Sequence, residues 1–183
     1  MVDEPFGGPT EEAAAGVRGR RTRVRPATTA DAPLLVAWHA DPDVSRYWDD
    51  ETFTLAEMRE RLVRPGVEPY VVEDEDGAPI GYLQVWSEGG DEGGIDMFLV
   101  PAARGRGLGP DAARAVARRL LGERAWRRVT VDPYGWNEAA VRAWARAGFV
   151  PVSEHEPDEE HTAPWLLMEL RAGTEALSPD TAS

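Results

Sequence analysis

The stretch from residue 94 to residue 110 limits the possible folds of this chain more than any other. It begins with a short run of β-forming residues, Ile95 to Val100, which is interrupted by a single acid, Asp96. Three alternating glycines follow, in the order Arg104-Gly105-Arg106-Gly107-Leu108-Gly109, and then a long Ala- and Arg-rich helical pattern. A glycine loop between a strand and a helix start presents backbone N–H groups that an anion can accept. The order therefore predicts a strand–loop–helix unit with a phosphate site.

The spacing of these glycines separates the loop from two better-known phosphate loops. A Walker loop ends in Gly-Lys-Ser/Thr, and Pro110 stands where its lysine would be. A dinucleotide fingerprint needs Gly-x-Gly-x-x-Gly, and the final gap is missing here. An NAD-binding protein is therefore disfavoured. Two interpretations are left, a phosphate loop to which Arg104 and Arg106 add positive charge, and a plain glycine-rich turn.

Composition limits the class of protein and its partners. The 183 residues, 42% hydrophobic and 29% charged, are typical of one globular domain with its own core. The chain has no cysteine, which excludes disulfides and thiolate metal sites, and no residue cluster has metal-ligand spacing, so we expect no metal. A net charge of −13 disfavours nucleic acid and anionic membranes as partners and favours a cationic ligand, although acidity can also serve solubility alone.

Two further absences bear on location. No apolar run approaches the roughly 20 residues of a membrane span. The first residues lack the apolar core of a secretory signal. We therefore expect a cytoplasmic protein, as a monomer or a homodimer, with tails at residues 1–20 and 171–183 around a single domain at 21–170.

Hydrophobic periodicity and capping signals predict the elements of this domain. Thr54 followed by Glu57 forms a capping box, and Gly148 is a typical helix stop. Strands are expected at 21–25, 69–73, 80–86, 94–100, 127–131, 149–153 and 165–170, and helices at 30–39, 54–64, 110–121 and 137–147. The order predicts an α/β fold with a mixed, mostly antiparallel sheet of six to seven strands and helices on both faces.

Two stretches together resemble the GNAT superfamily of N-acetyltransferases. The segment from Arg104 to Gly109 is similar to the acyl-CoA pyrophosphate loop of that family. The later segment is similar to its second signature, with Asn137, Ala140, Trp144 and then Gly148-Phe149. The resemblance covers residues 22–170. It is greatest to aminoglycoside 6′-N-acetyltransferases, on the segments Tyr47-Trp48, Pro79 to Gln84, Gly94-Ile95-Asp96 and Val131-Asp132-Pro133.

The resemblance implies a binding site for acetyl-CoA. The fourth and fifth strands, at 94–100 and 127–131, would splay apart, and the pantetheine arm would lie in the gap. Backbone groups of Phe98 and Val100 would pair with that arm as an added strand does. The implied acetyl-CoA-binding residues are Phe98, Leu99, Val100, Arg104, Gly105, Arg106, Gly107, Leu108, Gly109, Asn137 and Trp144.

The resemblance also suggests catalytic residues. An attacking amine must be neutral, and a carboxylate within hydrogen-bond reach can take its proton. Asp96 is the leading candidate for this base and Asp132 the second, although either can be an ordinary surface or turn acid. The family usually has tyrosine as the general acid where this chain has Trp144, whose indole does not release a proton usefully. The acid is then water, Tyr134 or Tyr82.

The acceptor site would combine aromatic walls with carboxylates, because flat apolar faces suit sugar rings and carboxylates suit ammonium groups. Its expected residues are Trp48, Asp49, Asp50, Tyr82, Trp86, Asp96 and Asp132, with Glu51 nearby. His155 and His161 are interpreted as surface residues, and Trp38, Trp126 and Trp144 as core. The implied reaction is acetylation of a small polycationic amine, an aminoglycoside first. Alternatives are a siderophore precursor, a polyamine, a protein N-terminus, or a non-catalytic acyl-CoA sensor.

Overall fold

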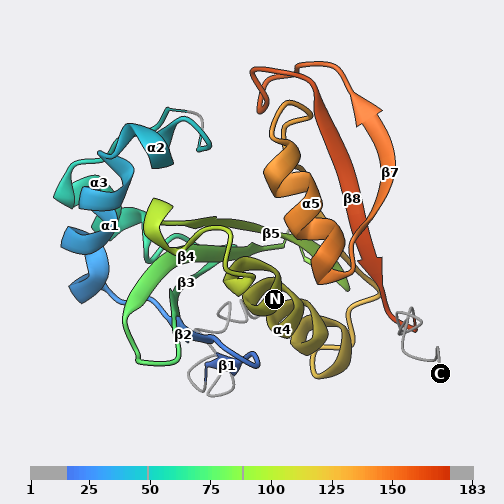
Figure 1. Cartoon of the computed structure of the whole chain (residues 1–183), viewed down its shortest axis with the longest axis horizontal. Helices are drawn as coiled ribbons and strands as arrows, with labels where there is room; N and C mark the ends of the chain where they lie inside the picture. Colours follow the sequence, from blue (N-terminus) through green and yellow to red (C-terminus); the bar gives the residue numbers. More distant parts are fainter. Residues whose placement is uncertain (1–15, 49, 88, 174–183) are drawn as a thin grey trace, which may run out of the picture.

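The computed structural model describes residues 16–48, 50–87 and 89–173. They form one eight-stranded sheet in the order β1-β2-β3-β4-β5-β6-β8-β7 (Figure 1). The strands are β1 (Val17–Arg18), β2 (Arg23–Pro26), β3 (Val67–Glu73), β4 (Pro79–Trp86), β5 (Glu92–Leu99), β6 (Arg128–Val131), β7 (Val150–His155) and β8 (Trp165–Arg171). The helices are α1 (Ala32–His39), α2 (Pro42–Ser45), α3 (Leu55–Arg61), α4 (Leu108–Gly122) and α5 (Glu138–Ala147), with 3₁₀ turns η2 (Thr29–Asp31) and η3 (Pro101–Ala103).

All neighbouring strands in this sheet are antiparallel except β5 and β6, which run parallel. The predicted fold class is therefore confirmed, with one strand more than expected. The additional strand is β1, which falls in the segment predicted as a tail. Residues 1–15 and 174–183 of the predicted tails lie outside the described residues, whereas Arg171 belongs to β8.

The β1–β2 hairpin forms because its turn wraps around a side chain of α4. Asp111, in the first turn of α4, accepts hydrogen bonds from the N–H groups of Arg20 and Arg21 and from Thr22 Oγ1, at 3.0, 2.9 and 2.8 Å. A Cβ at Gly19 would lie 2.2 Å from the same carboxylate, so only glycine fits there. This contact spans about 90 positions of the sequence, which is why local patterns did not predict it.

Helices cover both faces of the sheet (Figure 1). Successive side chains of a strand point to opposite faces. Leu83, Ile95 and Leu99 join a core with α4 and α5, whereas Tyr82 and Phe98 join a second core with α1, α2 and α3. The even-numbered residues of β4 and β5 near this second core therefore share one face, and that face includes Gln84 and Asp96.

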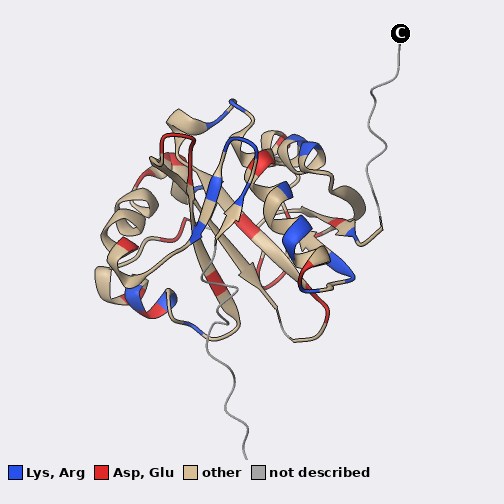
Figure 2. Cartoon of the chain, turned by 90° about the horizontal axis from the view of Figure 1, so that it is seen from below, with Lys and Arg blue, Asp and Glu red and all other residues tan. Residues whose placement is uncertain are grey.

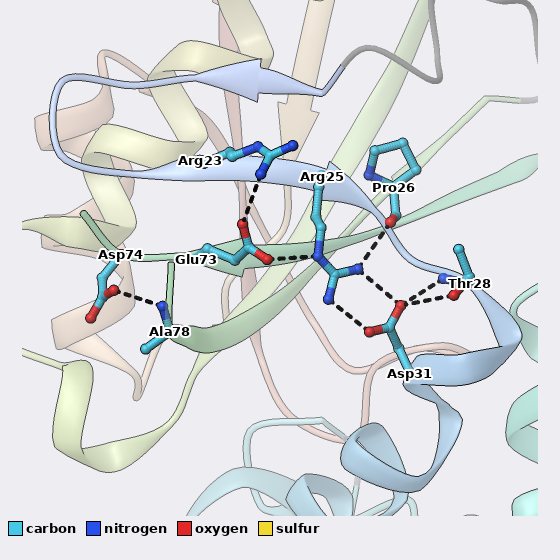
Figure 3. Close-up of polar contacts among 8 residues, drawn as sticks. All are labelled: Arg23, Arg25, Pro26, Thr28, Asp31, Glu73, Asp74 and Ala78. Atoms are coloured by element: carbon cyan, nitrogen blue, oxygen red, sulfur yellow. Dashed lines mark hydrogen bonds and ion pairs between the residues drawn. The ribbon is translucent and has the colours of Figure 1, made fainter. Parts of the chain in front are cut away.

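A partly buried ion cluster attaches the start of α1 to the sheet (Figure 3). Arg25 on β2 donates from Nε to Glu73 on β3 at 2.7 Å, and from Nη1 and Nη2 to Asp31 at 2.9 and 2.7 Å. Asp31 also accepts from the Thr28 N–H, and its hydrogen bonds with Arg25 hold its pKa below the usual range. These paired charges fix where the α1–α3 layer lies over the sheet.

The sheet divides where β5 meets β6. The two strands pair only from Glu92 to Gly94, with Arg128 to Thr130, and in the described chain no residue of β5 beyond Gly94 pairs with β6. The predicted splaying of these strands is confirmed. A Cβ at Gly94 would lie 2.3 Å from the Trp86 indole, so this glycine lets the indole cross the strand beside the gap.

Figure 2 shows acidic and basic positions interspersed over helices, strands and loops. Among the described helices, none is long and apolar enough to cross a membrane.

Candidate active site

A cleft of about 670 Å³ opens where β5 and β6 separate. Its walls come from the segment after α2, from α3, from β4 and β5, from the β6–α5 connection, and from the β7–β8 loop. The lining residues include Tyr47, Trp48, Glu51, Arg61, Arg64, Gln84, Trp86, Asp96, Met97, Asp132, Tyr134, Asn137, Trp144, Glu160 and His161. Segments that are distant in the sequence thus meet at one opening in the sheet.

The backbone of β5 faces this gap through its odd-numbered residues. The Val100 N–H donates to the Ile80 carbonyl at 2.9 Å, so even-numbered residues of β5 exchange hydrogen bonds with β4. Odd-numbered residues point the other way, as the bond from Thr130 Oγ1 to the Gly93 carbonyl shows. The prediction for Phe98 and Val100 was therefore wrong, because their backbone groups face β4. Met97 and Leu99 are the residues that could pair with an extended ligand.

The glycine loop has the geometry of an anion site. Gly105 and Gly107 have φ values of +72° and +77°, a left-handed conformation that favours glycine. Helix α4 begins at Leu108, two residues earlier than predicted, with Gly107 as its N-cap. The N–H groups of Leu108 and Gly109 therefore lie in the first turn, where a helix offers them no carbonyl. Pro110, in the same turn, contributes no N–H.

Arg104, predicted to bind phosphate, has other hydrogen-bond partners in this structure. Its N–H donates to the Pro101 carbonyl at 3.2 Å. Its guanidinium donates to the Leu99 carbonyl at 2.8 Å and to the Asp43 carbonyl at 2.7 Å, and it lies 5.2 Å from the Tyr47 ring centroid. These contacts join the end of β5 to α2. Arg106 is exposed on the loop, and the Arg21 guanidinium, which donates to the Arg106 carbonyl at 2.9 Å, also brings positive charge there.

Asn137 and Trp144, both predicted from the second signature, line the cleft. Asn137 is the N-cap of α5, where its side-chain oxygen accepts from the Ala140 N–H at 3.2 Å, which leaves its amide N–H₂ as a donor. Trp144 is 7% exposed and packs edge-on against Phe149. It therefore belongs to the core and to the cleft wall at once.

Asp96 lies opposite Gln84 across the β4–β5 pair, on the face that carries α1–α3. The Gln84 amide donates to Asp96 Oδ2 at 2.7 Å, and the Tyr82 hydroxyl donates to Gln84 Oε1 at 3.2 Å. Burial and the negative charge of Asp132 raise the pKa of Asp96 to about 7, against the opposing hydrogen bonds from Gln84 and Trp86. A carboxyl group with this pKa exchanges protons near neutral pH.

Asp132 follows the end of β6, on the other side of the gap. Burial raises its pKa, and His161, whose Nε2 lies 3.4 Å from Asp132 Oδ2, opposes that rise. The interpretation of His161 as a surface residue was wrong, because its side chain is only 13% exposed and its ring stacks on Trp165. His155 is exposed, as predicted.

The other predicted acceptor residues divide into three groups. Trp86 and Tyr134 line the cleft, and so does Trp48, although it is 8% exposed and packs on Tyr82 and Phe98. Tyr82 is 1% exposed, and burial raises its pKa to about 12, so it supports Gln84 from beneath rather than contacting an acceptor or donating a proton to it. Asp50 is exposed and outside the cleft lining, and Asp49 lies outside the described residues.

Sequence reasoning missed three lining residues that affect the chemistry. Gln84 was quoted only as part of a strand, yet the pairing of 84 with 96 makes it the amide partner of Asp96. Arg61 ends α3 and lies 3.8 Å from Glu51, and its charge lowers the pKa of Asp96. His161 gave no signal, because nothing in the sequence places the β7–β8 loop beside Asp132.

The site combines a split in a mixed sheet, outward-facing backbone of β5, a glycine loop at a helix start, and two carboxylates with raised pKa values. Such a site is typical of an N-acyltransferase. Residues 21–150 match the acetyltransferase (GNAT) domain model, and the chain belongs to this family of enzymes.

Curated relatives and solved structures agree with this assignment. The chain is 31% identical over 142 residues to aminoglycoside N(6′)-acetyltransferase type 1 of Klebsiella pneumoniae, which covers 67% of this chain and 70% of that protein. The corresponding protein of Serratia marcescens gives the same values. A structure of AAC(6′)-Ib with acetyl-CoA and paromomycin has a TM-score of 0.75 at 25% identity, over 87% of this chain and 99% of that one.

A second structure of the same enzyme, with coenzyme A and kanamycin, has a TM-score of 0.70 at 26% identity, over 82% of this chain and 94% of that one. Spermidine N-acetyltransferase of Vibrio cholerae, solved with coenzyme A and spermine, has a TM-score of 0.73 at 14% identity, over 82% of this chain and 95% of that one. That identity shows the shared fold alone.

Proposed function

We propose that this enzyme transfers the acetyl group of acetyl-CoA to a primary amine of a small polycationic acceptor, an aminoglycoside at its 6′-amine. The observation that carries the proposal is the pair Asp96 and Asp132, which face one cleft at the gap between β5 and β6. The relatives named for aminoglycoside 6′-acetylation support this choice of acceptor.

The residues around the gap fit acetyl-CoA. The backbone of Met97 and the N–H of Leu99 would pair with the pantetheine arm as an added strand does, while the Leu99 carbonyl accepts from Arg104 Nε. The Asn137 amide would donate to the same arm. The N–H groups from Gly105 to Gly109 and the Arg106 guanidinium would hold the pyrophosphate. Bound there, acetyl-CoA supplies a thioester, an acyl group already activated for attack by an amine.

The two carboxylates perform separate tasks in the proposed mechanism. Asp132, on the other side of the gap, attracts the ammonium group of the acceptor as a carboxylate. Asp96, with its pKa of about 7, takes the proton that the ammonium must lose before its nitrogen can attack. The Gln84 amide donor keeps the Asp96 carboxylate oriented toward the cleft. The thiolate of coenzyme A can leave without a dedicated acid, because free thiols have a pKa of about 8.5 and their anions are stable enough near neutral pH.

The charge of the cleft supports a cationic acceptor. Among the described residues, four carboxylates line it, from Glu51, Asp96, Asp132 and Glu160, against two guanidiniums, from Arg61 and Arg64. Arg61 lies beside Glu51, so this pair partly cancels. The aromatic faces of Trp48, Trp86 and Tyr134 in the same cleft suit sugar rings better than they suit a linear polyamine.

Thiol release from acetyl-CoA would test the proposal, with a panel of aminoglycosides, polyamines, N-hydroxylysine and short peptides. We expect turnover with aminoglycosides, and a loss of about 100-fold or more in kcat for Asp96→Asn. Asp50→Asn, outside the cleft, is the matched control and should keep wild-type rates. Acetyl-CoA binding without turnover on any amine would instead favour a non-catalytic acyl-CoA sensor, the interpretation that Trp144 in place of tyrosine suggests.

A further inference from the structure

His161 connects the candidate base pair to the solvent through two carboxylates. Its Nε2 lies 3.4 Å from Asp132 Oδ2, and its Nδ1 lies 3.0 Å from Asp158 Oδ1. The Asp132 side chain is 35% exposed and that of His161 only 13%, whereas Asp158 is 45% exposed. The three side chains thus form a continuous line of proton donors and acceptors from the cleft to the surface.

The imidazole in this line is held in a fixed orientation. Its ring stacks on Trp165 with the centroids 4.2 Å apart and an angle of 16°, and it meets the Tyr134 ring edge-on at 6.0 Å. Asp158 in turn accepts from the Trp165 indole N–H at 3.1 Å and from the His161 N–H at 2.8 Å. Trp165 therefore orients both members of the His161–Asp158 pair.

The line through His161 gives the candidate base pair an outlet to Asp158, which does not line the cleft. Each turnover leaves a proton on the Asp96–Asp132 pair, and the hydrogen-bond partners of Asp96, the Gln84 amide and the Trp86 indole, are N–H donors. Those donors have no lone pair that accepts a proton under these conditions. Asp132 is the member of the pair that contacts a group able both to accept and to release one.

We propose that His161 carries the amine proton from Asp132 to Asp158 and then to water. An N–H bond of the acceptor ammonium breaks as an O–H bond forms on Asp96, and the freed lone pair attacks the thioester. A water molecule in the cleft passes the proton from Asp96 to Asp132. The Asp132 O–H bond then breaks as a new Nε2–H bond forms on His161, and the Nδ1–H bond breaks as its proton passes to Asp158. Exchange of the ring protons with water restores the starting tautomer. Neutral imidazole can do both because it has one donor and one acceptor nitrogen.

This inference rests on the proposed acetyltransferase reaction, and it makes His161 a positioning and relay residue rather than a catalytic one. The titratable groups that face His161 are Asp132 and Tyr134 from the β6–α5 connection and Asp158 and Glu160 from the β7–β8 loop. Glu160 raises the pKa of Asp132 and His161 lowers it, so a change at either should move the titration of Asp132.

The test compares His161→Gln with His155→Gln. His155 stacks on the opposite face of the same indole, at 4.1 Å, and its Nε2 bonds with Ser153 Oγ, so it is chemically matched but contacts neither Asp132 nor Asp158. At pH 7 we expect kcat to fall about 100-fold in His161→Gln and to stay at the wild-type value in His155→Gln. In His161→Ala, added imidazole should restore a large part of kcat, with no effect on wild type.

Two controls separate a relay from a structural role. Thermal unfolding and acetyl-CoA binding should be unchanged in His161→Gln, and the ¹³C carboxyl titration of Asp132 should move to higher pH. Wild-type kcat in His161→Gln, or a loss that imidazole does not relieve in His161→Ala, would refute the relay while leaving the acetyltransferase proposal intact. Absence of turnover by the wild-type enzyme with every amine would refute the proposed function, and the relay with it.

Discussion

Replacing Asp132 with asparagine should move the pH dependence of the reaction to lower pH. Burial and the charge of Asp132 together raise the pKa of Asp96 from 3.8 to about 7. Both effects disfavour the ionised form of Asp96 in the folded protein. Asp132→Asn keeps the shape of the side chain and removes only its charge. Burial remains, so the pKa of Asp96 should fall without returning to 3.8.

A fall of about one unit, typical of coupled sites, can be converted into a rate. In the proposed mechanism Asp96 acts as a base only when it is ionised, so kcat/KM should rise with pH through its pKa. At pH 6 a group with a pKa of 7 is about 9% ionised, and a group with a pKa of 6 is half ionised. At pH 6, the fraction of its plateau kcat/KM that Asp132→Asn reaches should therefore be about five times the fraction that wild type reaches.

The measurement is the pH profile of kcat/KM together with a ¹³C carboxyl titration of Asp96. The titration gives the pKa of Asp96 directly, even if the turnover of Asp132→Asn is too slow for a pH profile. Gln84→Met is the opposing variant. It removes the amide that favours the ionised form of Asp96, so its profile should move to higher pH. An unchanged profile and an unchanged Asp96 titration in Asp132→Asn would contradict the electrostatic coupling of the two carboxylates.

Three further outcomes follow from the structure. Gly94→Ala places a Cβ 2.3 Å from the Trp86 indole and should lower the free energy of unfolding by about 1–3 kcal/mol. Gly122→Ala, whose Cβ would have nothing within 4 Å, should not lower it. Urea titration measures both variants, and equal stabilities would contradict the close approach at Gly94. Burial lowers the pKa of His39 from 6.5 to about 4, so the unfolded chain binds more protons than the folded one between these pH values. The free energy of unfolding should therefore fall by up to about 3 kcal/mol as the pH drops from 6.5 to 4. His39→Phe should flatten this pH dependence, and a variant that kept it would contradict the assignment to His39. Asp111→Ala removes three hydrogen bonds to the β1–β2 turn and should increase amide exchange there without unfolding α4. Hydrogen-exchange mass spectrometry measures this change. Unchanged protection of the hairpin amides would show that the hairpin does not depend on Asp111.

The confirmed predictions rest on local signals. Thr54 and Glu57 form the capping box that begins α3, and Gly148 ends α5 at a φ of +110°. The glycine loop does precede a helix, although the helix begins at Leu108. Each signal depends on backbone hydrogen bonding within a few residues, so the sequence alone contains it.

The errors share a different origin, since each involves groups that only the folded chain brings together. Whether the backbone groups of Phe98 or of Leu99 face the gap depends on the register of β5 with β4. A change of register by one residue would exchange the groups that face β4 with those that face the gap. Arg104 looked available for phosphate because the Leu99 and Asp43 carbonyls that accept its hydrogen bonds come from other elements.

The sequence by itself therefore determined the order of elements, the loop that can hold an anion, the family resemblance, and Asp96 and Asp132 as acids worth attention. Tertiary structure alone decided the environment of those acids. The pairing of Gln84 with Asp96, the charge of Asp132 in the same cleft, and the contact of His161 with Asp132 set their protonation. Proton affinity depends on burial and on charges within a few ångströms, and a linear chain defines neither until it folds.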